Sequence, residues 1–181
     1  MSGTKNTNIE IERKYLIKIP NMDILKSQPN YNASYIEQMY LSSQKDGTFK
    51  GDRIRKRVYS DVTKYYKTHK EYIRGFSKLE IEDEISEEEY KELSKRILSN
   101  SRVIKKVRHC FDFEGQVVEL DIYEFWNDKA TTEVEIENEE QTVTLPEFIK
   151  VIADVTGDKS YSNFALAEIK NEEERIEKNR V

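Results

Sequence analysis

The chain has 181 residues, a length typical of one domain, and 36% of them are charged while another 36% are hydrophobic. Its 30 Lys and Arg nearly balance 35 Asp and Glu, and 11 Tyr and 7 Phe are too many aromatic residues for a disordered chain. No apolar run is long enough to cross a membrane, and a single cysteine excludes a disulfide framework and a zinc ribbon, so we expect a cytoplasmic protein. The net charge of −5 argues against a dedicated nucleic-acid binder, and no glycine-rich phosphate loop is present.

Short runs of alternating apolar and polar residues dominate the chain and predict strands. We expect strands over residues 8–17, 34–43, 52–59, 63–70, 78–84, 103–113, 116–124 and 130–138. Helices are expected near 22–27, over 86–98 behind a Ser86/Glu89 capping box, from Pro146 onward, and in the charged tail 165–180. The helix after Pro146 is predicted from the helical spacing of Phe148, Ile149, Ile152 and Val155. Many strands with few helices predict a mainly β (α+β) fold, either a barrel or a strongly curved antiparallel sheet.

Charged residues recur at every second position within these strands, so they share one face of each strand. The alignment joins Glu10, Glu12 and Lys14; Arg53, Arg55 and Arg57; Glu80, Glu82 and Glu84; Lys106 and Arg108; Glu119 and Asp121; and Glu133, Glu135 and Glu137. When a single strand shows this pattern, the usual explanation is a sheet face that is exposed to solvent. Several strands, each nearly pure in sign, instead indicate acidic and basic strands around a shared lumen, because like charges repeated on one face cost stability. Carboxylates suit divalent cations and Arg and Lys suit phosphate oxygens, so the pattern indicates a metal–polyphosphate ligand.

These residues resemble the motifs of the CYTH group, the triphosphate tunnel metalloenzymes. Glu10, Glu12 and Lys14 are similar to its ExExK motif. Further similarities follow in order: 36–41 (IxQxYL), 53–55 (RxR), 68–70 (TxK), 80–85 (ExExxI), 106–108 (KxR), 119–121 (ELD), 133–135 (EVE) and 161–166 (YSNxxL). One departure is Lys78, where the family often has Arg; Lys keeps the charge but loses the bidentate geometry toward phosphate.

The resemblance implies an eight-stranded antiparallel closed β-barrel that forms a tunnel, with a few helices packed outside. We expect a flexible N-terminus over residues 1–8 and a single tunnel domain over 9–181. The resemblance further implies catalytic roles for Glu10, Glu12 and Lys14, with Mg²⁺ or Mn²⁺ as cofactor. The residues that the resemblance implies for triphosphate binding are Lys14, Arg53, Arg55, Lys70, Lys106 and Arg108. Those that it implies for metal binding are Glu10, Glu12, Asp121, Glu133 and Glu135. Glu80, Glu82 and Lys78 form a secondary set of candidates.

The predicted activity is a metal-dependent triphosphatase that removes the terminal phosphate of inorganic tripolyphosphate, with nucleoside triphosphates as secondary substrates. We expect no appended domain, and no pocket for a base or thiazole ring is recognisable, which favours the inorganic substrate. A class IV adenylyl cyclase, a thiamine triphosphatase and a non-catalytic polyphosphate- or nucleotide-binding module remain alternatives. The expected partner is a small triphosphate, with no nucleic acid and no membrane. A homodimer, the physiological substrate and the preferred metal are left open.

Overall fold

The computed structural model describes residues 6–168, which form a ten-stranded sheet with a few short helices. The strands are β1 (Asn6–Glu10), β2 (Glu12–Lys18), β3 (Asn32–Ser42), β4 (Phe49–Tyr59), β5 (Val62–Arg74), β6 (Ser77–Ile85), β7 (Ile104–Phe113), β8 (Gln116–Tyr123), β9 (Lys129–Glu135) and β10 (Val151–Asp154). The helices are α1 (Met22–Lys26), α2 (Glu87–Ser94), the 3-10 turn η1 (Lys159–Tyr161) and α3 (Asn163–Ala167). Within residues 6–168, none of the helices has the length and hydrophobicity needed to span a bilayer.

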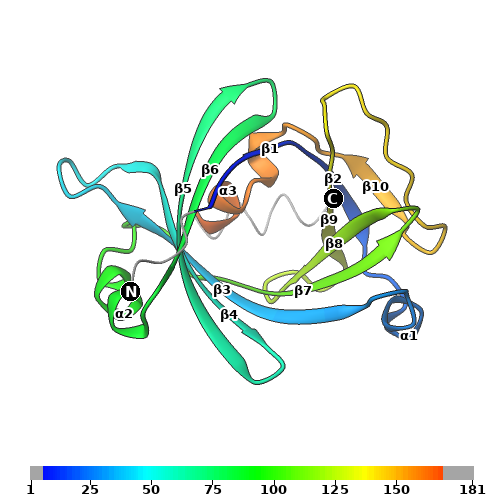
Figure 1. Ribbon diagram of the computed structural model, residues 1–181, viewed down its shortest axis with the longest axis horizontal. Coiled ribbons are helices and arrows are strands. Elements are labelled where there is room, and N and C mark those ends of the chain that lie inside the picture. Colours follow the sequence, from blue (N-terminus) through cyan, green and yellow to red (C-terminus); the bar gives the residue numbers. More distant parts are fainter. Residues whose placement is uncertain (1–5, 169–181) are drawn as a thin grey trace.

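The sheet is antiparallel throughout and follows the order β1-β6-β5-β4-β3-β7-β8-β9-β2-β10. The predicted eight-stranded closed barrel is therefore wrong in strand number and in closure, since the hydrogen-bonded order has two ends. Ile11 alone separates β1 from β2, so the predicted strand 8–17 is split where it changes partner, from β6 to β9. This covalent link joins the two halves of the curled sheet, and Figure 1 shows β1 at the top of the view, across from β3 and β4.

The segment after Pro146 is where the sequence-based prediction fails most clearly. A loop and the edge strand β10 replace the expected helix. Val151 and Ile152 are β-branched and favour extended backbone, and the free edge of β2 offers them a ladder in which Val151 lies opposite Ile17. Elsewhere the predicted helices are present but shorter: α2 ends at Ser94, and of the tail 165–180 residues 169–180 lie outside the described part of the chain.

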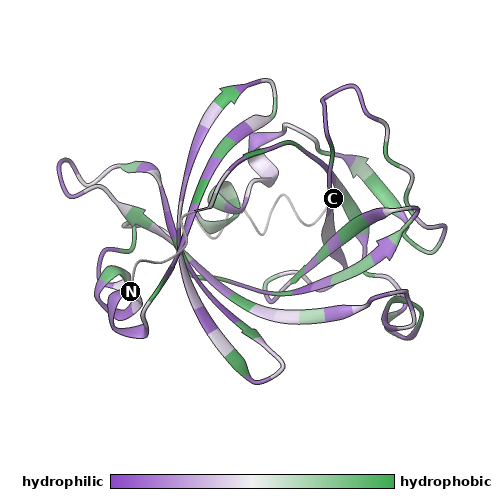
Figure 2. Cartoon of the chain, viewed as in Figure 1, coloured by the Kyte–Doolittle hydropathy of each residue, from purple (hydrophilic) through white to green (hydrophobic). Residues whose placement is uncertain are grey.

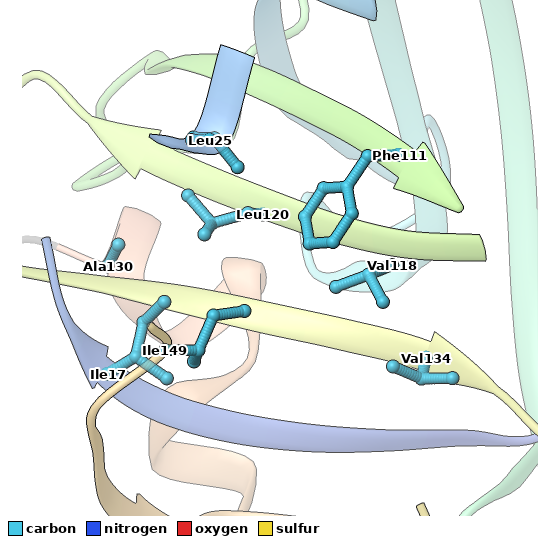
Figure 3. Packing of buried hydrophobic residues seen from close by; sticks show 8 residues of the cluster. All are labelled: Ile17, Leu25, Phe111, Val118, Leu120, Ala130, Val134 and Ile149. Atoms are coloured by element: carbon cyan, nitrogen blue, oxygen red, sulfur yellow. The ribbon is translucent and has the colours of Figure 1, made fainter. Parts of the chain in front are cut away.

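The largest hydrophobic cluster lies on the outer face of the sheet. Figure 3 shows Leu25 of α1 and Ile149 of the β9–β10 loop packed against the outward side chains of β2, β7, β8 and β9. Successive strand residues point to opposite faces, so Leu120 enters this core while its neighbours Glu119 and Asp121 point inward. Figure 2 shows the resulting alternation of hydrophilic and hydrophobic residues along the strands. Burying the apolar face outside thus turns the charged face toward the interior of the curl.

Candidate active site

The inner face of the curled sheet lines a cavity of about 340 Å³. This volume is at the small end of the range for ligand pockets, roughly 300–1,000 Å³. Its charged lining consists of Glu10, Glu12, Lys14, Arg53, Arg55, Arg57, Lys70, Lys78, Glu80, Lys106, Arg108, Glu119, Glu133 and Glu135. The uncharged lining residues are Ile36, Gln38, Tyr40, Phe49, Gly51, Ser162, Asn163 and Phe164. Every predicted site residue except Glu82 and Asp121 therefore contributes to the cavity wall among the described residues.

The arginines of β4 form one basic side of the cavity and are held by carboxylates of β6. Arg53 Nη2 lies 3.1 Å from Glu80 Oε2, and Arg55 Nη2 donates a short hydrogen bond to Glu82. Glu82 also accepts a hydrogen bond from Thr68 Oγ1 (3.0 Å), so it stands behind Arg55 and does not line the cavity. Glu82 therefore fits the role of orienting Arg55.

Two donors on this basic side have no acceptor in the described part of the chain. Arg53 Nε and Arg55 Nε are buried and find no hydrogen-bond partner among residues 6–168. A buried donor that is left unpaired costs about 1–3 kcal/mol, and more when it belongs to a charged group. Because Arg53 and Arg55 line the cavity, an anion there with several oxygen acceptors would satisfy them.

Asp121 organises the opposite basic side beneath the cavity surface. Arg108 donates to it from Nε (2.8 Å) and Nη2 (2.7 Å), and Lys106 Nζ donates a short hydrogen bond to it. Burial opposes ionisation of Asp121, but Arg108 and Lys106 outweigh this and lower its pKa. Burial and the neighbouring charge of Arg108 lower the pKa of Lys106 to about 8, although the negative charge of Asp121 acts to raise it. With 1% of its surface exposed, Asp121 is placed to fix two cations and not to meet a ligand itself.

Lys14 and Lys70 are each already paired with a carboxylate of the cavity. Lys14 Nζ lies 2.8 Å from Glu133 Oε1, and Lys70 forms a short ion pair with Glu10. Burial acts to raise the pKa of both carboxyls, but Lys14 and Lys70, respectively, outweigh it and lower the pKa. The same lysine ammonium groups face the cavity, so an incoming anion would compete with Glu133 and Glu10 for them.

Among the described carboxylates of the cavity, Glu12 and Glu135 are the least strongly paired, since Glu12 has one long ion pair and Glu135 has none. They lie directly opposite each other in the β2–β9 ladder, an arrangement that is destabilising for like charges. The Lys78 Nζ is 3.6 Å from Glu12 Oε1. Burial, with the charges of Glu133 and Glu10, raises the pKa of Glu12 to about 7. Partial burial and the charge of Glu119 likewise raise the pKa of Glu135.

This donor set fits a hard divalent cation that is shared with a ligand. Among residues 6–168, no group of three or more His, Cys, Asp or Glu side chains stands close enough to hold a metal without further donors. Mg²⁺ is commonly bound by one or two carboxylates, waters and substrate phosphates and not by an all-protein cage. Glu12 and Glu135 supply two such carboxylates, and a cation between them would offset the burial and the neighbouring negative charges that raise their pKa values.

An aromatic cluster lines one part of the cavity. Phe49 stacks on Phe164 of α3 at a centroid distance of 4.2 Å, and Tyr40 meets both rings edge-on. The Tyr40 hydroxyl accepts a hydrogen bond from Gln38 Nε2 (2.6 Å), and the Tyr123 hydroxyl donates to Asn163 Oδ1 (2.7 Å), which ties α3 to β8. The phosphate-like charges of a ligand would therefore be confined to the basic part of the cavity.

Several lining residues were missing from the predicted set although their strands were recognised. Glu119 and Arg57 share the alternation of Asp121 and Arg55, so residue spacing was a signal for both. Gln38 and Tyr40 lie within the IxQxYL resemblance. Phe164 follows the YSN tripeptide, and no signal in the sequence placed its ring against β3 and β4.

Solved structures with a similar fold include a protein called an inorganic triphosphatase and a protein from Pyrococcus horikoshii. The inorganic triphosphatase NE1496 is 27% identical, with a TM-score of 0.53, and the match covers 87% of this chain and 97% of the other. PH1819 from Pyrococcus horikoshii has a TM-score of 0.56 at 21% identity, over 72% of this chain and 80% of the other, and shares the fold. No family model and no curated protein matches the sequence.

The fold and the charged cavity define the class of protein. A curled antiparallel sheet carries acidic and basic residues on its inner face, in the order of the tunnel motifs, and resembles a structure called an inorganic triphosphatase. This similarity is consistent with the resemblance of the sequence to the CYTH, or triphosphate tunnel, motifs.

Proposed function

We propose that this protein is a metal-dependent triphosphatase that hydrolyses the terminal phosphate of inorganic tripolyphosphate. The observation that carries the proposal is the pair of buried, unpartnered Nε donors of Arg53 and Arg55. These two residues line a cavity that also offers Glu12 and Glu135 as cation ligands. The name of the similar triphosphatase NE1496 supports the same reaction class. The small cavity volume favours a compact inorganic anion over a polymer.

In this proposal the basic residues bind the triphosphate and stabilise the charge that develops on the leaving pyrophosphate. Arg53 and Arg55 contact it from β4, and Lys106 and Arg108 from β7, so the phosphates are held from two sides. Phosphoryl transfer depends mainly on such positioning and electrostatic stabilisation. Asp121 and Glu82 act as positioning residues, because each holds an arginine in place.

The carboxylates would hold the cation. Glu12 and Glu135 are the first candidates. Glu10 becomes available once phosphate oxygens draw Lys70 away, and Glu133 once they draw away Lys14 and Arg108. A divalent cation bound there would supply charge neutralisation and activation of water. No side chain need then be a strong base, in keeping with the absence of histidine from the lining of the described cavity.

The test is phosphate release from tripolyphosphate, ATP and thiamine triphosphate, each with Mg²⁺, Mn²⁺ or EDTA, with products separated by chromatography. We expect metal-dependent orthophosphate from tripolyphosphate. The Arg53→Ala/Arg55→Ala variant should lower kcat/KM at least about 100-fold, the effect of losing transition-state donors. Lys91→Ala, which removes an exposed cation of α2, is the control and should leave the rate unchanged. Cyclic AMP and pyrophosphate from ATP would identify a cyclase instead, and absence of turnover with every substrate would overturn the enzymatic proposal.

A further inference from the structure

One part of the cavity wall has no backbone ladder. The β1–β6 pairing ends with Glu10 opposite Lys78, and β2 then pairs with β9. Ser77 and the preceding β5–β6 turn consequently have no strand partner on the β2 side within the described residues. The gap lies beside Glu12, whose pKa is raised to about 7 by burial and by the charges of Glu133 and Glu10.

Glu139, in the loop that follows β9, bridges this gap through side-chain and backbone bonds. Its Oε1 accepts hydrogen bonds from the Phe76 N–H (3.1 Å) and from Ser77 Oγ (2.8 Å). Its carbonyl oxygen accepts a hydrogen bond from Arg13 Nη2 (2.7 Å) on β2. The Arg13 guanidinium also lies over the Phe76 ring, 5.4 Å from its centroid. We call Arg13, Phe76, Ser77 and Glu139 the Glu139 bridge.

The β5–β6 turn is shaped to admit this carboxylate. Gly75 has a φ of +53°, which favours glycine, and a Cβ atom there would collide with the Glu139 carboxylate. Hydrogen bonds from Ser77 and Phe76 lower the pKa of Glu139, so it is ionised at neutral pH. The turn therefore receives an anion from a loop that is distant in the sequence.

Both anchors of the bridge adjoin residues of the cavity. Arg13 is next to Glu12, and Ser77 is next to Lys78, whose Nζ lies 3.6 Å from Glu12 Oε1. Glu135, opposite Glu12, ends the strand that leads into the Glu139 loop. We infer that Glu139 is a positioning residue that sets the spacing of Glu12 and Glu135 and so the affinity of the site for a divalent cation. The inference rests on the proposed function, because it assigns these carboxylates to the cation.

The test measures Mn²⁺ binding to the full chain without substrate, by the loss of the free-ion EPR signal, together with kcat and KM for tripolyphosphate and thermal unfolding. Glu139→Ala should weaken Mn²⁺ binding about 10-fold, as is common when a residue that supports metal ligands is removed. It should raise the Mn²⁺ concentration needed for half-maximal rate and leave KM at saturating metal nearly unchanged. Glu139→Gln, which keeps an acceptor oxygen, should recover most of the affinity. Ser77→Ala removes one donor and provides a milder variant if Glu139→Ala does not fold.

Glu140→Ala is the matched control, since it removes an exposed carboxylate one position along the same loop. It should bind Mn²⁺ like the wild type. Wild-type affinity in both Glu139→Ala and Ser77→Ala would overturn the inference and leave Glu139 a purely structural residue, while wild-type turnover would still uphold the proposed function. Metal-independent turnover, or no Mn²⁺ binding by the wild type, would overturn both the inference and the metal-dependent mechanism.

Discussion

His69 lies between two carboxylates on the face of β5 opposite to Lys70. Its Nδ1 is 2.7 Å from Asp52 Oδ1, and its Nε2 is 3.1 Å from Glu71 Oε1. Burial acts against protonation, but the hydrogen bonds to Asp52 and Glu71 outweigh it and raise the pKa of His69 above its usual value. The ion pairs therefore stabilise the fold fully below the usual histidine pKa of about 6.5, and this stabilisation is lost as the pH rises through the raised pKa.

We accordingly expect His69→Gln to destabilise the protein more near pH 5.5 than near pH 8.5, by less than about 1 kcal/mol because the pair is partly exposed. Urea unfolding of both proteins at the two pH values measures the difference. His109 provides an internal contrast: it is buried and its pKa is lowered, so any stabilisation linked to it is lost as the pH falls. An equal cost of His69→Gln at both pH values would contradict the assigned ion pairs.

Asp121 and Glu119 show what the sequence can say about single residues. Their spacing on β8 correctly predicts that both point inward, because strand residues alternate between faces. It does not predict that Arg108 and Lys106 cover Asp121, while Glu119 reaches the cavity. The depth of a side chain depends on the length and charge of residues on neighbouring strands, and the local pattern contains neither.

At the scale of elements, α1 has one fully buried side chain, Leu25, and packs a second, partly buried one, Met22, against the same core. The helix has five residues, and Asn21 Oδ1 caps it by accepting the amides of Asp23 (2.9 Å) and Ile24 (3.2 Å). An isolated helix of this length is not stable in water, so packing of its fully buried Leu25 against the outer face of the sheet must hold it.

Leu25→Ala should therefore lower the free energy of unfolding by about 2–5 kcal/mol, the range for a truncated core leucine. Ile24→Ala removes a side chain that is 45% exposed on the same helix and should cost less than about 0.5 kcal/mol. Denaturant titration of the two variants checks the contrast. Similar costs for both would mean that α1 does not use Leu25 as its anchor.

The elements that the sequence predicts well are those with a local signal. Alternation locates most strands, and Ser86 does cap α2 by accepting the Glu89 amide (3.1 Å). The break at Ile11 and the strand β10 are different, because each is determined by a partner strand far away in the chain. Periodicity tells which face a residue occupies but not which strand will pair with it.

At the scale of the whole molecule, the charge of the cavity opposes that of the chain. The net charge is −5, yet the cavity is lined by eight Lys and Arg side chains against six Glu. We expect tripolyphosphate to raise the Tm in EDTA, by the equivalent of about 2.7 kcal/mol at a concentration 100 times its Kd. Sulfate at equal ionic strength is the control for salt effects, and Arg53→Ala/Arg55→Ala should lose most of the shift. A Tm that responds equally to both anions would contradict a specific triphosphate site.

The change of partner strand at Ile11 also affects the order in which the sheet can form during synthesis. β2 is synthesised early. Its ladder, in which Glu12 lies opposite Glu135, can form only after β9 has been made, and the Lys14 amide can donate to the Thr156 hydroxyl only later still. Contacts between such distant residues form slowly and expose unpaired strands in the meantime. The hydrophilic side of the waiting strand, Glu12 and Lys14, then helps to keep it from aggregating. β2 is thus made early but is among the last strands to be paired on its β9 side.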